Sequence, residues 1–204
     1  MENKSSGTLD STIAYYNDNA KDYIRATINA DMSKLYAAFE HYLFPGCYIL
    51  DLGSGSGRDS KYFINQGYHV TAIDPSEEMC ASTQKVAGIV PLQIKAEELN
   101  IREKYDGVWA CASLLHLETA KLQVALLNIY RALKPGGIFY TSFKYGVEER
   151  EVGGRVFHNY TEATANNLIH ETGLFEVAEI FITGDTLPER EDERWVNIIA
   201  KKRK

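Results

Sequence analysis

The sequence predicts an α/β protein with one doubly wound, mainly parallel sheet and helices on both of its faces. Short apolar runs of strand length alternate with stretches of helical periodicity from residue 46 onward. A glycine-rich turn over residues 53–57 joins the first apolar run to the helix that follows it. The second run ends at Asp74, so an acidic side chain is expected at the tip of the neighbouring strand. This alternation is typical of parallel strands that are covered on both faces.

The bulk composition fits a single globular domain without a nucleic-acid surface. The chain has 204 residues, of which 45% are hydrophobic and 25% are charged. Its formal net charge is −6, and the only basic cluster is at residues 201–204, so nucleic acid is a disfavoured partner. The three cysteines lack metal-site spacing, which predicts free thiols and no metal. The start of the chain lacks the apolar core of a signal peptide, and no window is long enough to span a membrane. We therefore expect a cytoplasmic protein.

The first 45 residues are predicted to form a helical cap after a disordered start. Residues 1–11 are polar and small and lack periodicity, so disorder is expected there. Apolar and aromatic residues recur at helical spacing over residues 12–44, with a break around residues 29–31, where Asp31 can cap the second of two helices. Residues 46–202 then form the sheet, and the whole chain, 1–204, is expected to be one domain.

Seven strands are predicted in the sheet, and the last two have only a loop between them. That pair should form an antiparallel hairpin at the sheet edge. Residues 147–158 are charged and contain glycine, which predicts a loop or a small hairpin. The predicted strands cover residues 47–52, 68–73, 89–94, 105–112, 138–143, 175–183 and 195–201. The predicted helices between them cover residues 58–66, 77–86, 119–133 and 161–172.

The glycine turn and its surroundings resemble a known family. The run Asp51-Leu-Gly-Ser-Gly-Ser-Gly57 looks like the first motif of class I S-adenosylmethionine-dependent methyltransferases, whereas a dinucleotide-binding turn is more usually spaced GxGxxG. Asp74, Ala96-Glu97, the run 105–116 and the run 133–139 follow in the family's order. The resemblance covers residues 12 to about 200 and implies a Rossmann-like fold. Within the family the chain looks most like small bacterial stand-alone enzymes of the tellurite-resistance or thiopurine methyltransferase type.

The resemblance implies a site for S-adenosylmethionine, which leaves as S-adenosylhomocysteine. The backbone of the glycine turn should approach the cofactor, Asp51 should lie near its methionine end, and Asp74 should accept both ribose hydroxyls. Tyr15, Tyr16, Tyr23 and Arg25 could close over the methionine end. The residues expected to bind the cofactor are Tyr15, Tyr23, Asp51, Gly53, Gly55, Gly57, Arg58, Asp74, Pro75, Met79, Ala96, Glu97, Cys111 and His116.

The acceptor is expected to be a small molecule that is polar or anionic. Methyl transfer is an in-line displacement, so the protein must align the nucleophile and exclude water, and it needs a base only where the nucleophile carries a proton. The catalytic candidates are His116, Lys144 and Tyr15. The substrate-binding candidates are Lys144, Tyr145, Arg155, His158 and Arg194, all expected near the carboxyl ends of the strands.

Several alternatives stay open at this point. Each candidate also has a structural interpretation: the acids can cap strand ends, Met79 and Cys111 can be core residues, and His116 can be satisfied by loop backbone. The chain could be a non-catalytic cofactor-binding regulator, a methyltransferase of RNA or protein, or a nicotinamide oxidoreductase on a similar sheet. The absence of an Asn-Pro-Pro-Tyr run disfavours DNA bases and release factors as acceptors. A monomer and a homodimer are equally compatible with the sequence.

Overall fold

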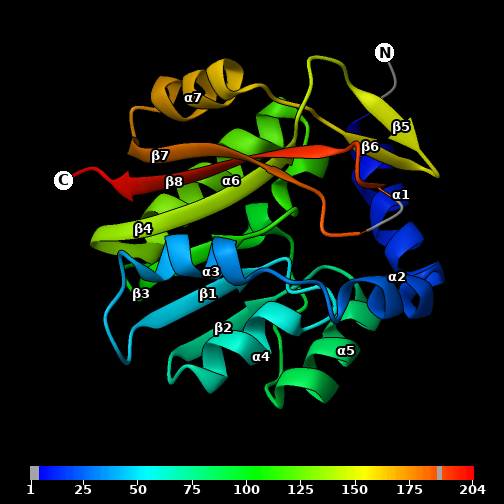
Figure 1. Cartoon of the computed structure of the whole chain (residues 1–204), viewed down its shortest axis with the longest axis horizontal. Helices are drawn as coiled ribbons and strands as arrows, with labels where there is room; N and C mark the ends of the chain where they lie inside the picture. Colours follow the sequence, from blue (N-terminus) through cyan, green and yellow to red (C-terminus); the bar gives the residue numbers. More distant parts are fainter. Residues whose placement is uncertain (1–4, 188–189) are drawn as a thin grey trace.

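One six-stranded sheet runs through the molecule. The computed structural model describes residues 5–187 and 190–204, with side chains from residue 11 onward in those ranges. The strand order is β2-β1-β3-β4-β8-β7 (Figure 1), and β8 runs antiparallel to both of its neighbours, β4 and β7. The antiparallel pair at the sheet edge is therefore as predicted. The strands are β1 Tyr48–Leu52, β2 His69–Ile73, β3 Tyr105–Ala110, β4 Leu133–Lys144, β7 Phe175–Gly184 and β8 Arg194–Lys202.

The predicted third strand, residues 89–94, does not form, and the prediction of seven strands is corrected to six. This segment makes a single parallel bridge, between Leu92 and Ile73 of β2. Pro91 lacks the backbone N–H that a longer ladder needs, and Val90 is 76% exposed, so the segment gains little from pairing at the sheet edge. A separate hairpin, β5 Arg150–Val152 and β6 Arg155–Phe157, lies outside the sheet, within the stretch predicted as a loop or small hairpin.

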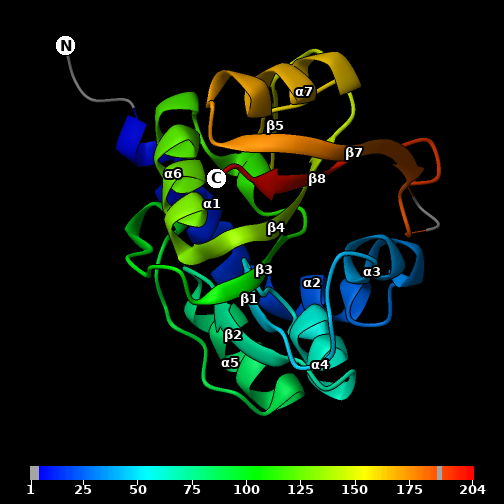
Figure 2. The ribbon, with the colours of Figure 1, turned by 90° about the vertical axis from the view of Figure 1, so that its left-hand side faces the viewer.

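Helices cover both faces of the sheet, as predicted. Figure 2 shows α6 on one side of the strands and α3 and α4 on the other. The helices are α1 Ser5–Asp18, α2 Ala20–Thr27, α3 Ser33–Glu40, α4 Arg58–Asn65, α5 Glu77–Ala87, α6 Thr119–Ala132 and α7 Glu162–Glu171, with short 3-10 turns at Ala96–Glu98 and Leu114–His116. Among the described residues, none of the helices has the length and apolar character that crossing a membrane requires.

The alternation of side chains along β3 separates two hydrophobic cores. Val108 faces the core beneath α6 and α7, where it packs with Leu126 and Ile169. Trp109 faces the core beneath α3 and α4, where it stacks on Tyr140 with ring centroids 4.0 Å apart. Both faces of the sheet are therefore buried, which leaves its carboxyl end as the place for a ligand.

The N-terminal region has three helices where the sequence predicted two. α1 begins at Ser5, so residues 5–11 are helical rather than disordered, and residues 1–4 lie outside the described part of the chain. An extra break occurs at Asn19, between α1 and α2. The predicted break at residues 29–31 is present, and the Asp31 carboxylate accepts a hydrogen bond from the Ser33 N–H at 2.9 Å. These breaks fold α1 and α2 over the carboxyl end of the sheet.

Candidate functional site

The glycine turn after β1 is held in a left-handed conformation that only glycine adopts without strain. Gly53, Gly55 and Gly57 have φ values of 81°, 51° and 83°. A Cβ on Gly53 would lie 2.4 Å from the Cβ of Ser113, and one on Gly57 would lie 2.7 Å from the Cα of Thr83. Gly53 and Gly55 line a cavity, whereas Gly57 packs against α5. The turn thus faces the cavity through Gly53 and Gly55 and packs against α5 through Gly57.

Asp74, at the end of β2, fixes the turn from the neighbouring strand. One carboxylate oxygen accepts the Gly55 N–H and the other accepts the Ser76 N–H, both at 2.9 Å. The side chain is almost fully buried, and burial raises the pKa of Asp74 to about 6, although these two hydrogen bonds favour the ionised form. Each oxygen keeps a lone pair for a further donor, as recognition of a vicinal diol requires.

A narrow cavity lies over the glycine turn, and we call it the glycine cavity. It has a volume of about 100 Å³. Two buried polar atoms in its wall, Glu97 Oε2 and Ser113 Oγ, have no hydrogen-bond partner in the protein. Since buried polar atoms are normally paired, these two atoms are suited to a polar ligand. The other residues in its wall include Thr12, Ile13, Tyr16, Tyr23, Gly53, Gly55, Asp74, Pro75, Met79, Ala96, Cys111 and His116.

Asp51 and Asp59 form a buried acidic pair behind the turn. Asp51 accepts the Ser60 hydroxyl at 2.5 Å and lines neither of the cavities described here. Burial and the nearby Asp59 charge raise the pKa of Asp51. Burial also opposes ionisation of Asp59, but the adjoining Arg58 guanidinium and the hydrogen bonds from Tyr36 and Trp109 outweigh it and hold the pKa of Asp59 below its usual value. Asp59 therefore ties α3 and β3 to the start of α4.

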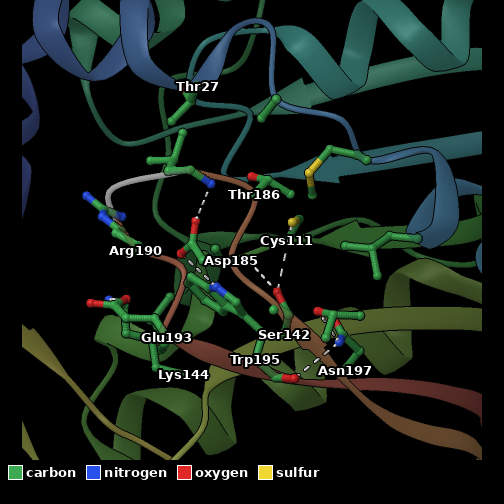
Figure 3. A pocket seen from close by; sticks show the side chains of 18 of the residues that line it. Thr27, Cys111, Ser142, Lys144, Asp185, Thr186, Arg190, Glu193, Trp195 and Asn197 are labelled. Carbon is green, nitrogen blue, oxygen red and sulfur yellow. Dashed lines mark hydrogen bonds and ion pairs between the residues drawn. The ribbon is translucent and has the colours of Figure 1, made fainter.

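A second cavity, of about 940 Å³, lies beside the first, and we call it the hairpin cavity. It is bordered by the α2–α3 loop, the ends of β4 and β8, the β5–β6 hairpin and the loop after β7. Figure 3 shows Thr27 and Cys111 across this cavity from Lys144, Glu193 and Trp195. Among the described residues, six basic and three acidic side chains line it: Lys34, Arg58, Lys144, Arg150, Arg155 and Arg190 against Asp31, Asp185 and Glu193. This excess of positive charge contrasts with the net charge of −6 for the chain.

The two cavities share one wall, made by Tyr16, Tyr23, Cys111, Ala112 and His116. The ring of His116 is fixed at both nitrogens: Nδ1 lies 2.7 Å from the Val156 carbonyl oxygen, and Nε2 lies 3.1 Å from the Tyr16 hydroxyl. Because a carbonyl only accepts, Nδ1 carries the proton and Nε2 is the acceptor. Burial, together with the neighbouring Arg155 charge, lowers the pKa of His116 to about 4. The shared wall thus holds a neutral imidazole with its basic nitrogen turned toward the Tyr16 hydroxyl.

The structure brings most of the predicted cofactor residues to the glycine cavity and separates a few from it. Lys144 and Arg155 line the hairpin cavity, as does Arg58, which was predicted on the cofactor side. Lys144 is paired with Glu193, and Arg58 is paired with Asp59. The predicted residues that line neither cavity are Tyr15, Asp51, Gly57, Tyr145, His158 and Arg194. No group of His, Cys, Asp and Glu side chains in the described part of the chain could hold a metal ion.

Tyr16 was expected to close over the methionine end but was left out of the residues expected to bind the cofactor, and it lines both cavities. Tyr15 lines neither cavity, and the Arg155 guanidinium lies 3.9 Å from its ring centroid, whereas Tyr16 and Tyr23 meet edge to face at 5.0 Å in the shared wall. Tyr16 and Tyr23 are seven residues apart, so helical spacing puts them on one face and Tyr15 on another. That spacing could have identified Tyr16, rather than Tyr15, as the partner of Tyr23 from the sequence. Ser113 and Glu193 carried no comparable signal.

Strand order and the position of the cavities define the class of protein. Parallel strands wound on both sides, with cavities at their carboxyl ends, make this a Rossmann-like nucleoside-binding fold. A family model described as "Methyltransferase domain" matches residues 50–141. The matched domain and the fold both agree with the resemblance to class I S-adenosylmethionine-dependent methyltransferases found in the sequence.

Three known proteins illustrate this similarity. The crystal structure of the Burkholderia thailandensis 1,6-didemethyltoxoflavin-N1-methyltransferase has a TM-score of 0.81 and 20% identity, and covers 100% of this chain and 92% of that protein. YqeM of Bacillus subtilis (strain 168), whose name describes a methyltransferase, is 28% identical over 146 residues. The match covers 62% of this chain and 59% of YqeM. TehB of Haemophilus influenzae (strain 10810), whose name describes an S-adenosyl-L-methionine-dependent methyltransferase, is 29% identical over 96 residues. The match covers 45% of this chain and 34% of TehB. The chain spans about half the length of the curated relatives it matches first.

Proposed function

We propose that the protein transfers a methyl group from S-adenosylmethionine to a small polar or anionic acceptor in the cytoplasm. The observation that carries this proposal is the pair of cavities with a common wall at the carboxyl end of the sheet. A donor and an acceptor that occupy adjoining cavities can meet at that wall, which is the arrangement that a displacement between two bound molecules needs.

The glycine cavity is the proposed site of the donor. Gly53 and Gly55 allow close approach to the backbone, Asp74 offers acceptors to the ribose hydroxyls, and Glu97 Oε2 is a buried acceptor without a partner, suited to the adenine amino group. When bound, S-adenosylmethionine supplies an electrophilic methyl group on a sulfonium sulfur. The toxoflavin enzyme of similar fold was solved with S-adenosylhomocysteine, which supports this choice of ligand.

The hairpin cavity is the proposed site of the acceptor. Its volume suits a small molecule rather than a macromolecular surface, and its basic lining favours a negative charge on that molecule. Tyr23 and Tyr16 would exclude water from the junction between the cavities, because both partly buried side chains belong to the shared wall. Positioning and exclusion of water are the main contributions that this reaction asks of the protein.

The donor site is tested by substituting Asp74 with alanine. We expect the affinity for S-adenosylhomocysteine, measured by isothermal titration calorimetry, to fall by roughly 1–3 kcal/mol, because hydrogen bonds to a charged group are lost. Asp22→Ala is the matched control, since Asp22 is an exposed acid of α2 that lines neither cavity. An unchanged dissociation constant for Asp74→Ala would mean that the ribose is held elsewhere.

The enzyme interpretation has its own test. Incubation with methyl-labelled S-adenosylmethionine and fractionated metabolites should give a labelled small product. Tight cofactor binding without product in any fraction would favour a non-catalytic regulator. Binding of a nicotinamide dinucleotide in place of S-adenosylhomocysteine would favour an oxidoreductase, and label in RNA or protein would favour a macromolecular acceptor.

A further inference from the structure

We propose that Arg155 is the anchor for an anionic group of the acceptor, and that His116 Nε2 takes the proton from the acceptor's nucleophilic O–H or N–H. The acceptor class is then an acid that carries a proton-bearing nucleophile close to a carboxylate or phosphate. This inference rests on the proposed function and adds to it the substrate class and the residue that selects it.

Part of the hydrogen-bonding edge of Arg155 remains for an anion, while its guanidinium also forms a hydrogen bond with the Tyr16 side chain. One face of the guanidinium stacks on Tyr15 at 3.9 Å, and Phe157 lies 5.1 Å away. Stacking uses the face of the group and not its N–H donors. Arg155 Nε is buried without a hydrogen-bond partner, and no carboxylate of the described residues forms an ion pair with this side chain. A buried donor of this kind is costly unless a ligand satisfies it.

Two other cations that line the hairpin cavity, Lys144 and Arg58, are already neutralised by acids. Lys144 forms an ion pair with Glu193, and Arg58 forms one with Asp59. Arg155 is therefore a better candidate than Lys144 or Arg58 for a bidentate contact with an incoming carboxylate or phosphate.

The β5–β6 hairpin and α1 together hold Arg155 in place. The Ser11 hydroxyl donates to the Gly154 carbonyl at 2.9 Å, which ties the turn of the hairpin to α1. A Cβ on Gly153 would lie 3.3 Å from the Tyr15 ring, so the two elements are in close contact. Because Arg155 begins β6 directly after this turn, the anchor is positioned by elements on both sides of it.

His116 lies close to this anchor. Tyr16 is 5.8 Å from both the His116 ring and the Arg155 guanidinium, and Phe157 contacts both side chains as well. The Tyr16 hydroxyl now donates to Nε2, so it marks the place where an O–H or N–H of an acceptor would donate. An anionic group on Arg155 would thus hold the nucleophile of the same molecule near Nε2 and near the shared wall.

The chemical step balances with these groups. A lone pair of the acceptor's oxygen or nitrogen forms the new bond to the methyl carbon while the electrons of the S–C bond remain on sulfur. The proton of the nucleophile passes to His116 Nε2 and later to solvent. The Val156 carbonyl accepts from Nδ1–H throughout, which favours the imidazolium that forms.

Binding of the anion should also make His116 a stronger base. The charged groups that face this imidazole are Arg155 on β6, Lys144 on β4 and His158 after β6, with Tyr16 on α1 as the neutral partner. The positive charge of Arg155 opposes a second positive charge on His116. A carboxylate paired with Arg155 removes that opposition, so the protein would activate its base only when the correct class of acceptor is bound.

The experiment uses benzoate as the probe and the full-length protein saturated with S-adenosylhomocysteine. Calorimetry should show saturable benzoate binding to the wild type that Arg155→Gln weakens at least about tenfold, the lower limit expected for a charged hydrogen bond. The benzoate affinity of Arg155→Lys should lie between those of the wild type and Arg155→Gln, because lysine keeps the charge but lacks the planar guanidinium. Arg131→Gln, a surface change on α6 that lines neither cavity, is the control. NMR titration of His116 should show its pKa rising with benzoate in the wild type and not in Arg155→Gln.

The outcomes separate the two proposals. Equal benzoate affinity in the wild type and Arg155→Gln, or no saturable benzoate binding to the wild type, would overturn the role of Arg155. If Arg155→Gln does not fold, as judged by circular dichroism, an unchanged His116 pKa in the benzoate-bound wild type would overturn it. Failure of the wild type to bind S-adenosylhomocysteine would instead contradict the proposed function.

Discussion

The protonation state of His116 is set by two neighbours from distant parts of the chain. Val156, 40 residues further along, supplies the carbonyl that fixes the tautomer, and Tyr16, 100 residues earlier, supplies the hydroxyl. The position of His116 just after a strand was enough to predict it as a candidate. Neither partner could be predicted, because helix and strand periodicity carry no information about contacts at that separation. The same holds for Arg155, whose stacking on Tyr15 depends on how the hairpin meets α1.

The buried imidazole predicts a pH dependence of stability. The pKa of His116 in the folded state, about 4, is below that of an exposed histidine, so the unfolded chain binds the proton first as the pH falls. The free energy of unfolding should therefore decrease between about pH 6.5 and 4, by up to roughly 3 kcal/mol from this group. Urea denaturation of the wild type and His116→Gln over this range measures the difference.

Comparison with the variant is necessary because Asp74 acts in the opposite direction. Its pKa is raised to about 6 by burial, so this carboxyl favours the folded state as the pH falls from 6 toward 4. The Asp74 contribution is common to both proteins and cancels in the difference. A difference in unfolding free energy that does not change with pH would show that His116 is not buried in its neutral form.

At the level of elements, the glycine turn was the most predictable part of the site. Its place between β1 and α4 follows from the sequence alone, and so do the end of β2 at Asp74 and the cap of α5 at Ser76, whose hydroxyl accepts the Met79 N–H. The role of Gly57 did not follow. It was expected beneath the cofactor, but the close approach of α5 behind it is a tertiary contact that the spacing of glycines does not encode.

Two glycines at the ends of α4 offer a matched test of that contact. Gly57 and Gly67 both have φ near 85°, so alanine costs about 1–2 kcal/mol of backbone strain at either position. A Cβ at Gly57 would also overlap Thr83 Cα, whereas nothing lies within 4 Å of one at Gly67. Gly57→Ala should therefore reduce the free energy of unfolding by roughly 1–3 kcal/mol more than Gly67→Ala, the cost of overpacking. Equal losses in urea denaturation would indicate that α5 moves away easily.

Strand prediction failed at residues 89–94, where the local pattern was apolar but the edge position was unfavourable, and β4 begins at Leu133, five residues before the predicted strand. Residues 89–94 were predicted as a strand because the segment is rich in isoleucine, valine and leucine, yet Pro91 and the exposure of Val90 leave a single bridge to β2. The number of strands thus depended on whether pairing at the sheet edge stabilises this segment. The sequence pattern carries no information about that balance.

At the level of the whole molecule, the sheet was predictable and the hairpin cavity was not. Regular alternation of strands and helices leaves few possible topologies, and the observed order is one of them. The wall of the hairpin cavity comes from stretches spread between Tyr16 and Asn197, which meet only when the fold is complete. Its net positive lining, within an acidic chain, is therefore a property of the assembled molecule.

Ligand binding should stabilise the molecule unevenly. Residues of α1 and α2 line the glycine cavity, whereas α7 lines neither cavity. With S-adenosylhomocysteine at 100 times its dissociation constant, amides of residues 12–27 that exchange only when the site opens should slow by up to about 100-fold. Hydrogen exchange followed by mass spectrometry measures this, and α7 is the internal control. Equal protection of both regions would mean that α1 and α2 do not enclose the ligand.

Beyond the wall that they share, the two cavities are lined by different residues. Ile13 and Lys95 border the glycine cavity, and Lys34 and Thr186 border the hairpin cavity. We therefore expect each ligand to enter and leave its own cavity without crossing the other, so that neither has to wait for the other. For an enzyme with two ligands this arrangement corresponds to random-order kinetics, in which either partner binds first and a slowly released product does not trap its companion.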